Sequence, residues 1–151
     1  MMESQHAPGT QNLMSISNNN GFLLLFSGNE WHKELSLDEI QKIVSQNKTW
    51  FERLAAQGKV MGGHALVRRG ATVSGRNGRL VSDGPFAEAK EAIGGTLLLD
   101  VETLEEAIAI AQTSPSLSYG TSIEVRPVAG ECPLDAYASE LARQETSTAN
   151  A

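Results

Sequence analysis

The sequence predicts an α+β fold, because two amphipathic helices alternate with four strands along one short chain. The chain has 151 residues, which is the length of a single domain. The helices are predicted over 36–58 and 103–112, and the strands over 21–27, 59–69, 95–101 and 122–128. With an inserted β-hairpin over 71–82 set aside, the order is strand, helix, strand, strand, helix, strand, which is the ferredoxin-like βαββαβ arrangement.

The first and third strands are apolar on both faces. In 21–27, Phe22, Leu24 and Phe26 point to one side, whereas the intervening leucines point to the other. The strand "GTLLLDV" (95–101) has the same character. Two helices cover one face of a four-stranded sheet, and a large open apolar face is uncommon on a monomer. We therefore expect a homodimer with its sheets packed face to face about a two-fold axis.

The two main helices carry recognisable start signals. Ser36 with Glu39, and Thr103 with Glu106, form capping boxes. Apolar residues follow at helical spacing in both segments, and Gly58 is predicted to end the first helix.

The middle of the chain predicts strand 59–69, then the hairpin with its turn near Arg76-Asn77-Gly78. A short helical piece is predicted over Ala87–Ala92. Strand 122–128 alternates apolar and charged residues, so one of its faces is predicted to be buried and the other to be more exposed to solvent.

The two ends are set apart from the predicted domain at 21–128. Residues 1–20 are polar and lack an apolar period, which predicts disorder. Residues 129–151 form a tail in which 132–144 predicts one more amphipathic helix. Cys132, the single cysteine, lies in this tail and is predicted to be a free exposed thiol.

Charge and composition exclude several classes of protein. A net charge of −6 argues against general affinity for nucleic acid or an anionic membrane. No apolar run approaches the roughly 20 residues that span a bilayer, and "GFLLLF" is too short for a signal-peptide core, so we expect a cytoplasmic protein. The three histidines lack metal-ligand spacing, and we predict neither a metal nor a cofactor.

The quartet Asp83-Gly84-Pro85-Phe86 carries a family resemblance. It is followed by Ala87, Glu88, Lys90 and Glu91, and then by Gly94-Gly95 at the start of an apolar strand. This stretch resembles the DGPF group of the YCII-related family, and the agreement runs from Gly21 to Val128, including "LAAQGKVMGG" and "SIEVRPV". The resemblance implies a dimeric α+β barrel, in agreement with the dimer expected from the two-faced strands.

The resemblance also implies two kinds of function. Some YCII-related members are linked to His–Asp acid–base chemistry, including a dehydrochlorinase of aromatic breakdown, and DGPF members are often associated with sigma-factor regulators. The branch with proposed chemistry carries its histidine in the first helix. Here 36–58 contains none, and Asn47, Lys48 and Trp50 occupy that part of the helix, so the dyad does not carry over as it stands.

Asp83 and His64 are the candidate catalytic residues. Asp83, at a strand end, suits a general base, or it accepts turn N–H groups as a cap. His64 follows Gly62-Gly63 on a strand, where it could transfer protons or be a half-buried, hydrogen-bonded residue. We expect both side chains at one cavity. His32, beside Trp31, is a weaker candidate.

Three further residues are candidate ligand contacts. Arg68 belongs to the only basic cluster, Arg68, Arg69, Arg76 and Arg79, which suits an anionic ligand or a solvated hairpin face. Phe86 either plugs the core or lines a pocket rim, and Trp50 is placed on the first helix. The chain has no phosphate-binding loop and no Gly-x-Ser-x-Gly motif.

These observations leave three functions open. The first is a small-molecule enzyme of the lyase, isomerase or dehydrohalogenase kind, cofactor-free, in which Asp83 and His64 transfer protons. The second is a non-catalytic ligand-binding or regulatory module that acts beside a transcription regulator. The third is a purely structural dimer.

Overall fold

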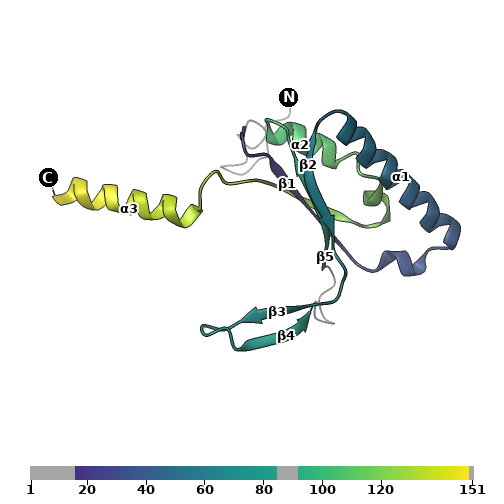
Figure 1. The fold of residues 1–151 in the computed structure, drawn as a ribbon, viewed down its shortest axis with the longest axis horizontal. Helices are drawn as coiled ribbons and strands as arrows, with labels where there is room; N and C mark the ends of the chain where they lie inside the picture. Colours follow the sequence, from purple (N-terminus) through teal and green to yellow (C-terminus); the bar gives the residue numbers. More distant parts are fainter. Residues whose placement is uncertain (1–15, 85–91, 150–151) are drawn as a thin grey trace, which may run out of the picture.

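The main sheet has the predicted ferredoxin-like topology. The computed structural model describes residues 16–84 and 92–149. Four antiparallel strands lie in the order β2-β5-β1-β6 (Figure 1). Their bounds are Phe22–Gly28 for β1, Val60–Ala65 for β2, Ala92–Leu99 for β5 and Ser122–Pro127 for β6. This order places the first and third strands of the ferredoxin-like motif in the centre, so the α+β prediction is confirmed.

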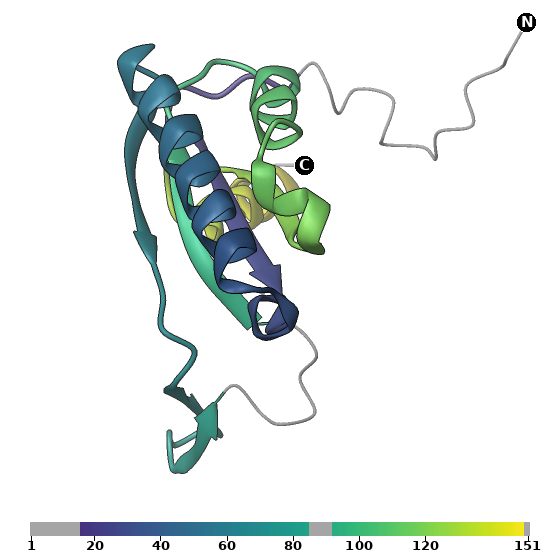
Figure 2. The same cartoon turned by 90° about the vertical axis from the view of Figure 1, so that its right-hand side faces the viewer.

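Both main helices lie on one side of this sheet, which we call the helix face (Figure 2). They are α1 (Leu37–Ala56) and α2 (Leu104–Ala111). Two short 3-10 helices, η2 (Trp31–Glu34) and η3 (Pro115–Tyr119), were not predicted from the sequence. Residues of both line the hollows beside α1.

The predicted helix ends are confirmed in atomic detail. The Ser36 hydroxyl accepts the Glu39 N–H at 3.2 Å, and the Thr103 hydroxyl accepts the Glu106 N–H at 3.2 Å. Gly58 has a left-handed φ of 71°. Its N–H reaches the Ala55 carbonyl at 3.0 Å, and the next N–H reaches the Leu54 carbonyl at 3.1 Å. These two bonds are a Schellman motif, which satisfies carbonyls at the end of α1.

The two faces of the sheet differ in burial. On the helix face, Phe22, Leu24 and Leu97 are at most 2% exposed. On the opposite side, which we call the open face, Leu23 pairs with Leu98, and neither reaches the burial of the core residues. The apolar residues that the sequence places on both faces are therefore covered on one face within the protomer.

Two arms extend from this body (Figure 1). The hairpin arm is β3 (Gly70–Ser74) and β4 (Leu80–Gly84), which form a two-stranded sheet of their own. Gly75 and Gly78 have positive φ at its turn, as the predicted hairpin requires. The second arm is α3 (Pro133–Ala149), where Cys132 just before it is exposed as predicted.

Several predicted boundaries differ from the structure. Strand β2 ends at Ala65 because the chain leaves the main sheet for the hairpin arm there, whereas the prediction ran to 69. Strand β5 begins at Ala92, so the last residue of the predicted short helix is in a strand; 87–91 lie outside the described residues. Helix α3 runs to Ala149, five residues past the predicted 144.

The end of the segment predicted to be disordered is held against the core. The Asn18 amide donates to the carbonyls of Gly21 and Val128, both at 2.7 Å, and Ser17 pairs with Thr103. Backbone bonds from Asn18 N–H to the Glu102 carbonyl and from Leu104 N–H to the Ile16 carbonyl add to these contacts. Hydrogen bonds leave no hydrophobic period in the sequence, which is why the pattern missed this piece. Residues 1–15 lie outside the described part of the chain. Among the residues described, no helix is long and apolar enough to cross a membrane.

Candidate functional site

An open cleft lies between α1 and the helix face of the sheet. It consists of two adjoining hollows of about 570 Å³ and 380 Å³. Both hollows are lined by Phe26, Asn47, Gly94 and Ser116, so we treat them together as the inner cleft. Its combined size is within the range of small-molecule sites.

The floor of the inner cleft is open because small residues stand where other strand positions carry leucine. Gly63, Ala65 and Gly95 lie on β2 and β5 beside the buried Leu97. A Cβ on Gly63 would lie 2.6 Å from the Thr96 carbonyl oxygen, so glycine is required there by the backbone itself. The sheet therefore leaves a gap beneath α1 that side chains do not fill.

A bulge in β5 shapes the mouth of the cleft. Phe26 pairs with Gly95 but the next residue, Ser27, pairs with Ile93, which leaves Gly94 unpaired in the β1 ladder. The Gly94 carbonyl instead accepts the Leu66 N–H at 2.9 Å. Bulges of this kind often redirect the chain beside functional sites.

One wall of the inner cleft is charged. The Glu30 carboxylate is 2.8 Å from the Lys33 ammonium and 3.6 Å from Arg68 Nε. The hydrogen bond from Lys33 lowers the pKa of Glu30 below its ordinary value, and the nearby Arg68 and His32 act in the same direction. His32 and Arg68 line the cleft together with this carboxylate.

Aromatic side chains form another part of the wall. Trp31 stacks on Tyr119 with ring centroids 5.3 Å apart, and Phe26 meets Trp50 edge-on at 6.3 Å. The Trp50 indole N–H donates to the Thr113 hydroxyl at 2.7 Å. This bond ties α1 to the end of α2, so Trp50 is held in place from both sides.

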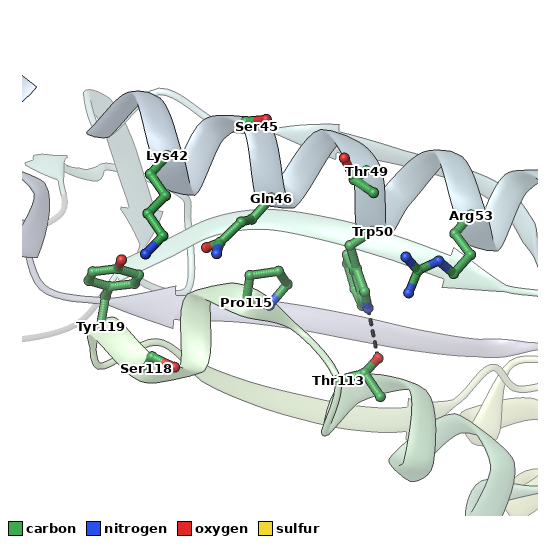
Figure 3. Close-up of a pocket in the computed structure, with 10 residues that line it drawn as sticks. All are labelled: Lys42, Ser45, Gln46, Thr49, Trp50, Arg53, Thr113, Pro115, Ser118 and Tyr119. Atoms are coloured by element: carbon green, nitrogen blue, oxygen red, sulfur yellow. Dashed lines mark hydrogen bonds between the residues drawn. The ribbon is translucent and has the colours of Figure 1, made fainter. Parts of the chain in front are cut away.

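A second, outer groove of about 540 Å³ lies between α1 and η3 (Figure 3). Lys42 and Arg53 stand toward its two ends, and Trp50 lies between them with its hydrogen bond to Thr113 (Figure 3). Because Trp50 also lines the inner cleft, this one side chain contributes to both hollows. The outer groove is the more polar of the two spaces.

The structure brings Trp50 and Arg68 to the inner cleft, as two of the predicted ligand contacts. His64 also borders it, but only near its backbone. It pairs with Thr96, whose neighbours Gly95 and Leu97 face the helices. Since side chains alternate along a strand, the His64 imidazole lies on the open face.

Of the quartet Asp83-Gly84-Pro85-Phe86, the structure describes only Asp83 and Gly84. Asp83 pairs with Ala71 in the hairpin arm. Phe86 lies outside the described residues, as does the rest of 85–91. The described chain resumes at Ala92, and Ala92, Ile93 and Gly94 all line the inner cleft. The shared Asp83–His64 site stays a prediction.

Sequence reasoning missed several residues that the fold brings to this site. Glu30 and Trp31 lie in a short connection, "SGNEWHKE", which gave no periodic signal. Ser116 is buried, and its hydroxyl is 3.0 Å from that of Ser114. A proline at the start of η3 is a helix-start signal that could have indicated this turn. No cluster of three or more potential metal ligands occurs among the described residues.

Comparison with known proteins finds a family match over most of the chain. The model of the YCII-related domain matches residues 28–130. An uncharacterized protein of Rhizobium meliloti (strain 1021) is 44% identical over 59 residues, which is 36% of this chain and 48% of the relative. The chain therefore spans about half the length of that curated relative. Helix α3 lies outside the matched residues.

Proposed function

The chain belongs to the YCII-related family, and on that premise we propose that it binds a small anionic molecule in the inner cleft. The observation that carries this proposal is the position of Arg68 in the wall of a hollow that also has aromatic and aliphatic lining. Apolar surface combined with placed polar groups is typical of small-molecule sites.

Arg68 keeps donors for a ligand. Its Nε is 3.6 Å from Glu30, which is beyond a good hydrogen bond. The same carboxylate is held at 2.8 Å by Lys33, so Glu30 is already satisfied by another cation. A guanidinium has five N–H donors, and its terminal pair matches a carboxylate or phosphate in a bidentate geometry.

The other lining residues favour a ligand with an apolar body. Phe26, Trp31 and Ile93 offer aromatic and aliphatic surface, and Asn47 adds an amide that lines both hollows. We therefore expect a carboxylate on a small aromatic or aliphatic frame. Phe86 is retained in the proposal as a ligand contact on the strength of the sequence alone.

The test is calorimetric titration with benzoate, phenylacetate and hexanoate, each compared with its neutral amide. We expect the acids to bind more tightly than the amides, and Arg68→Gln to remove that difference. Arg69→Gln is the matched control, because Arg69 is an exposed neighbour that does not line the cleft. Equal loss in both variants, or no preference for the acids, would contradict the proposal.

Cofactor-free proton transfer is the second candidate function. The observation that favours it is the pair Glu30 and His32 in the wall of the cleft. Asp83 and His64 retain the proton-transfer roles that the sequence predicts. If His64→Gln and Asp83→Asn both lose turnover, those roles are supported. If only His32→Gln loses turnover, proton transfer is instead carried out by a residue of the cleft wall. Binding without turnover would favour the non-catalytic or regulatory module.

We also propose that a second copy of the chain covers the open face. The support is the row of incompletely buried leucines there, Leu23, Leu25 and Leu98. Face-to-face packing of two such sheets would bury them.

A further inference from the structure

The hairpin arm lacks the support that a two-stranded sheet needs. Val73 and Val81 pair across its strands, and both are more than 60% exposed. Leu80 is exposed next to them. An isolated two-stranded hairpin is marginally stable at best in water, and packing against another element is needed to secure it. The arm therefore presents an apolar surface that is left exposed among the described residues.

Helix α3 also exposes an apolar side. Leu134, Tyr137 and Leu141 are all exposed, and their spacing places them on one side of the helix. The helix extends away from the body of the protein (Figure 1). An amphipathic helix of 17 residues is only marginally stable without tertiary packing. Its apolar side therefore needs a partner surface.

The two arms carry opposite charge. Arg76 and Arg79 lie at the hairpin turn, shortly after Arg68-Arg69, and the arm's acidic residue is Asp83 in β4, which leaves the arm basic. Acidic residues predominate in and just before α3, where Arg143 is the only cation: Glu131, Asp135, Glu140 and Glu145. Unlike surfaces of this kind attract each other and fix the register of an interface.

We propose that the two arms are exchanged between two copies of this chain. The hairpin arm of one protomer packs along α3 of the other, and the same contact recurs about a two-fold axis. A second copy is the occupant that the charges specify, because each chain supplies one basic and one acidic arm, both with an exposed apolar side. The arms extend in different directions from one protomer (Figure 1), so the contact is made between copies.

The area of the open face supports this inference. A four-stranded sheet with strands of about seven residues is roughly 23 Å by 19 Å. Two such faces in contact would bury about 900 Å², short of the roughly 1,200–2,000 Å² of stable interfaces. Two arm contacts, each about 17 Å long and 10 Å wide, would add roughly 700 Å². The exchanged arms therefore bring the dimer into the stable range.

The first test is charge reversal measured by sedimentation equilibrium at low salt. We expect Arg76→Glu with Arg79→Glu to raise the dimer dissociation constant at least tenfold. Adding Asp135→Lys and Glu145→Lys to the same chain should restore association. The control is Lys42→Glu with Lys48→Glu on α1, which changes the net charge equally and should leave the dissociation constant unchanged. Far-UV circular dichroism checks that every variant is folded.

The second test is a cross-link between chains in which Cys132→Ser has removed the native thiol. One chain carries Val73→Cys and the other carries Tyr137→Cys. We expect a covalent dimer mainly when the two chains are mixed and oxidised. Cross-links that form equally well in each chain alone would overturn the exchange, and so would a charge reversal that the added lysines do not restore. Neither result would alter ligand binding in the inner cleft, so the two proposals fail separately.

Discussion

The two faces of the central strands are built from similar residues but have different surroundings. Leu24 and Leu25 are neighbours on β1; the first is fully buried and the second is not. The helix face is covered by α1 and α2, and the open face is covered by neither (Figure 2). Strand alternation decides which side a leucine occupies, but what covers that side depends on other parts of the assembly.

The two faces contribute to different equilibria, the helix face to folding of the protomer and the open face to association. The helix face stabilises the protomer, because its side chains are removed from water by the chain's own helices. The open face would contribute through association, because its side chains lose contact with water only when something packs on them. Substitutions on the two faces should therefore act on different measured quantities.

The largest expected effect is on the helix face. Leu24→Ala should lower the free energy of unfolding by about 2–5 kcal/mol, because it leaves a cavity in a closed core. Leu25→Ala, on the same strand, should cost less than about 1 kcal/mol in dilute protein. Urea denaturation at nanomolar concentration, below the micromolar range in which the dimer is expected, measures both. Equal losses would show that the open face is already covered within the protomer.

The next effect concerns association through the open face. Leu25→Glu should raise the dimer dissociation constant by roughly 100-fold, or about 2.7 kcal/mol, because a charge would be buried between the sheets. Light scattering should then shift from twice the 16.2 kDa chain mass toward one chain mass. Leu37→Glu, on the exposed part of α1, is the control and should leave the dimer intact. A parent protein that is monomeric at micromolar concentration would refute the face-to-face dimer.

A smaller effect tests how α1 is held over the helix face. Gly58→Ala should cost about 1–2 kcal/mol, since a side chain resists the left-handed φ of 71°. No atom lies within 4 Å of the added Cβ, so the cost is conformational rather than steric. Gly62→Ala is the matched control, because its Cβ is equally free and its φ is ordinary. Thermal unfolding should separate the two variants by several degrees.

The smallest effect is a pH dependence at the rim of the inner cleft. Lys33 lowers the pKa of Glu30 from its ordinary 4.5, so this ion pair stabilises the folded state above that pH. The contribution should disappear as the pH falls through the lowered pKa. Melting temperatures of the parent and Glu30→Gln should therefore converge below about pH 4.5. Lys33→Met should remove the largest part of the same pH dependence, because Arg68 and His32 still act on Glu30. A pH-independent difference between the parent and Glu30→Gln would contradict the assignment.

Much of the fold could be predicted from local signals. Capping by Ser36 and Thr103, the end of α1 at Gly58 and the hairpin turn near Gly78 all depend on residues within a few positions of one another. The strand order followed from the element order, because the ferredoxin-like motif leaves few alternatives.

The site was predicted less completely, because its residues come from separate parts of the chain. Arg68 and Trp50 were identified by residue type, and both line the inner cleft. His64 was placed at a cavity, but its pairing with Thr96 puts the imidazole on the open face. Glu30 and Ser116 gave no periodic signal, since connections and 3-10 helices of one or two turns are too short to show a period.

The sequence by itself determined the elements, their ends and the two-faced character of β1 and β5, because these depend on backbone preference and side-chain period. Only the tertiary structure decided which face the helices cover and where space remains. Covering is a property of layers. The inner cleft exists because Gly63 on β2, and the small pair Ala65 and Gly95 next to it, come together beneath α1 after strands distant in sequence have paired. No local pattern contains that juxtaposition.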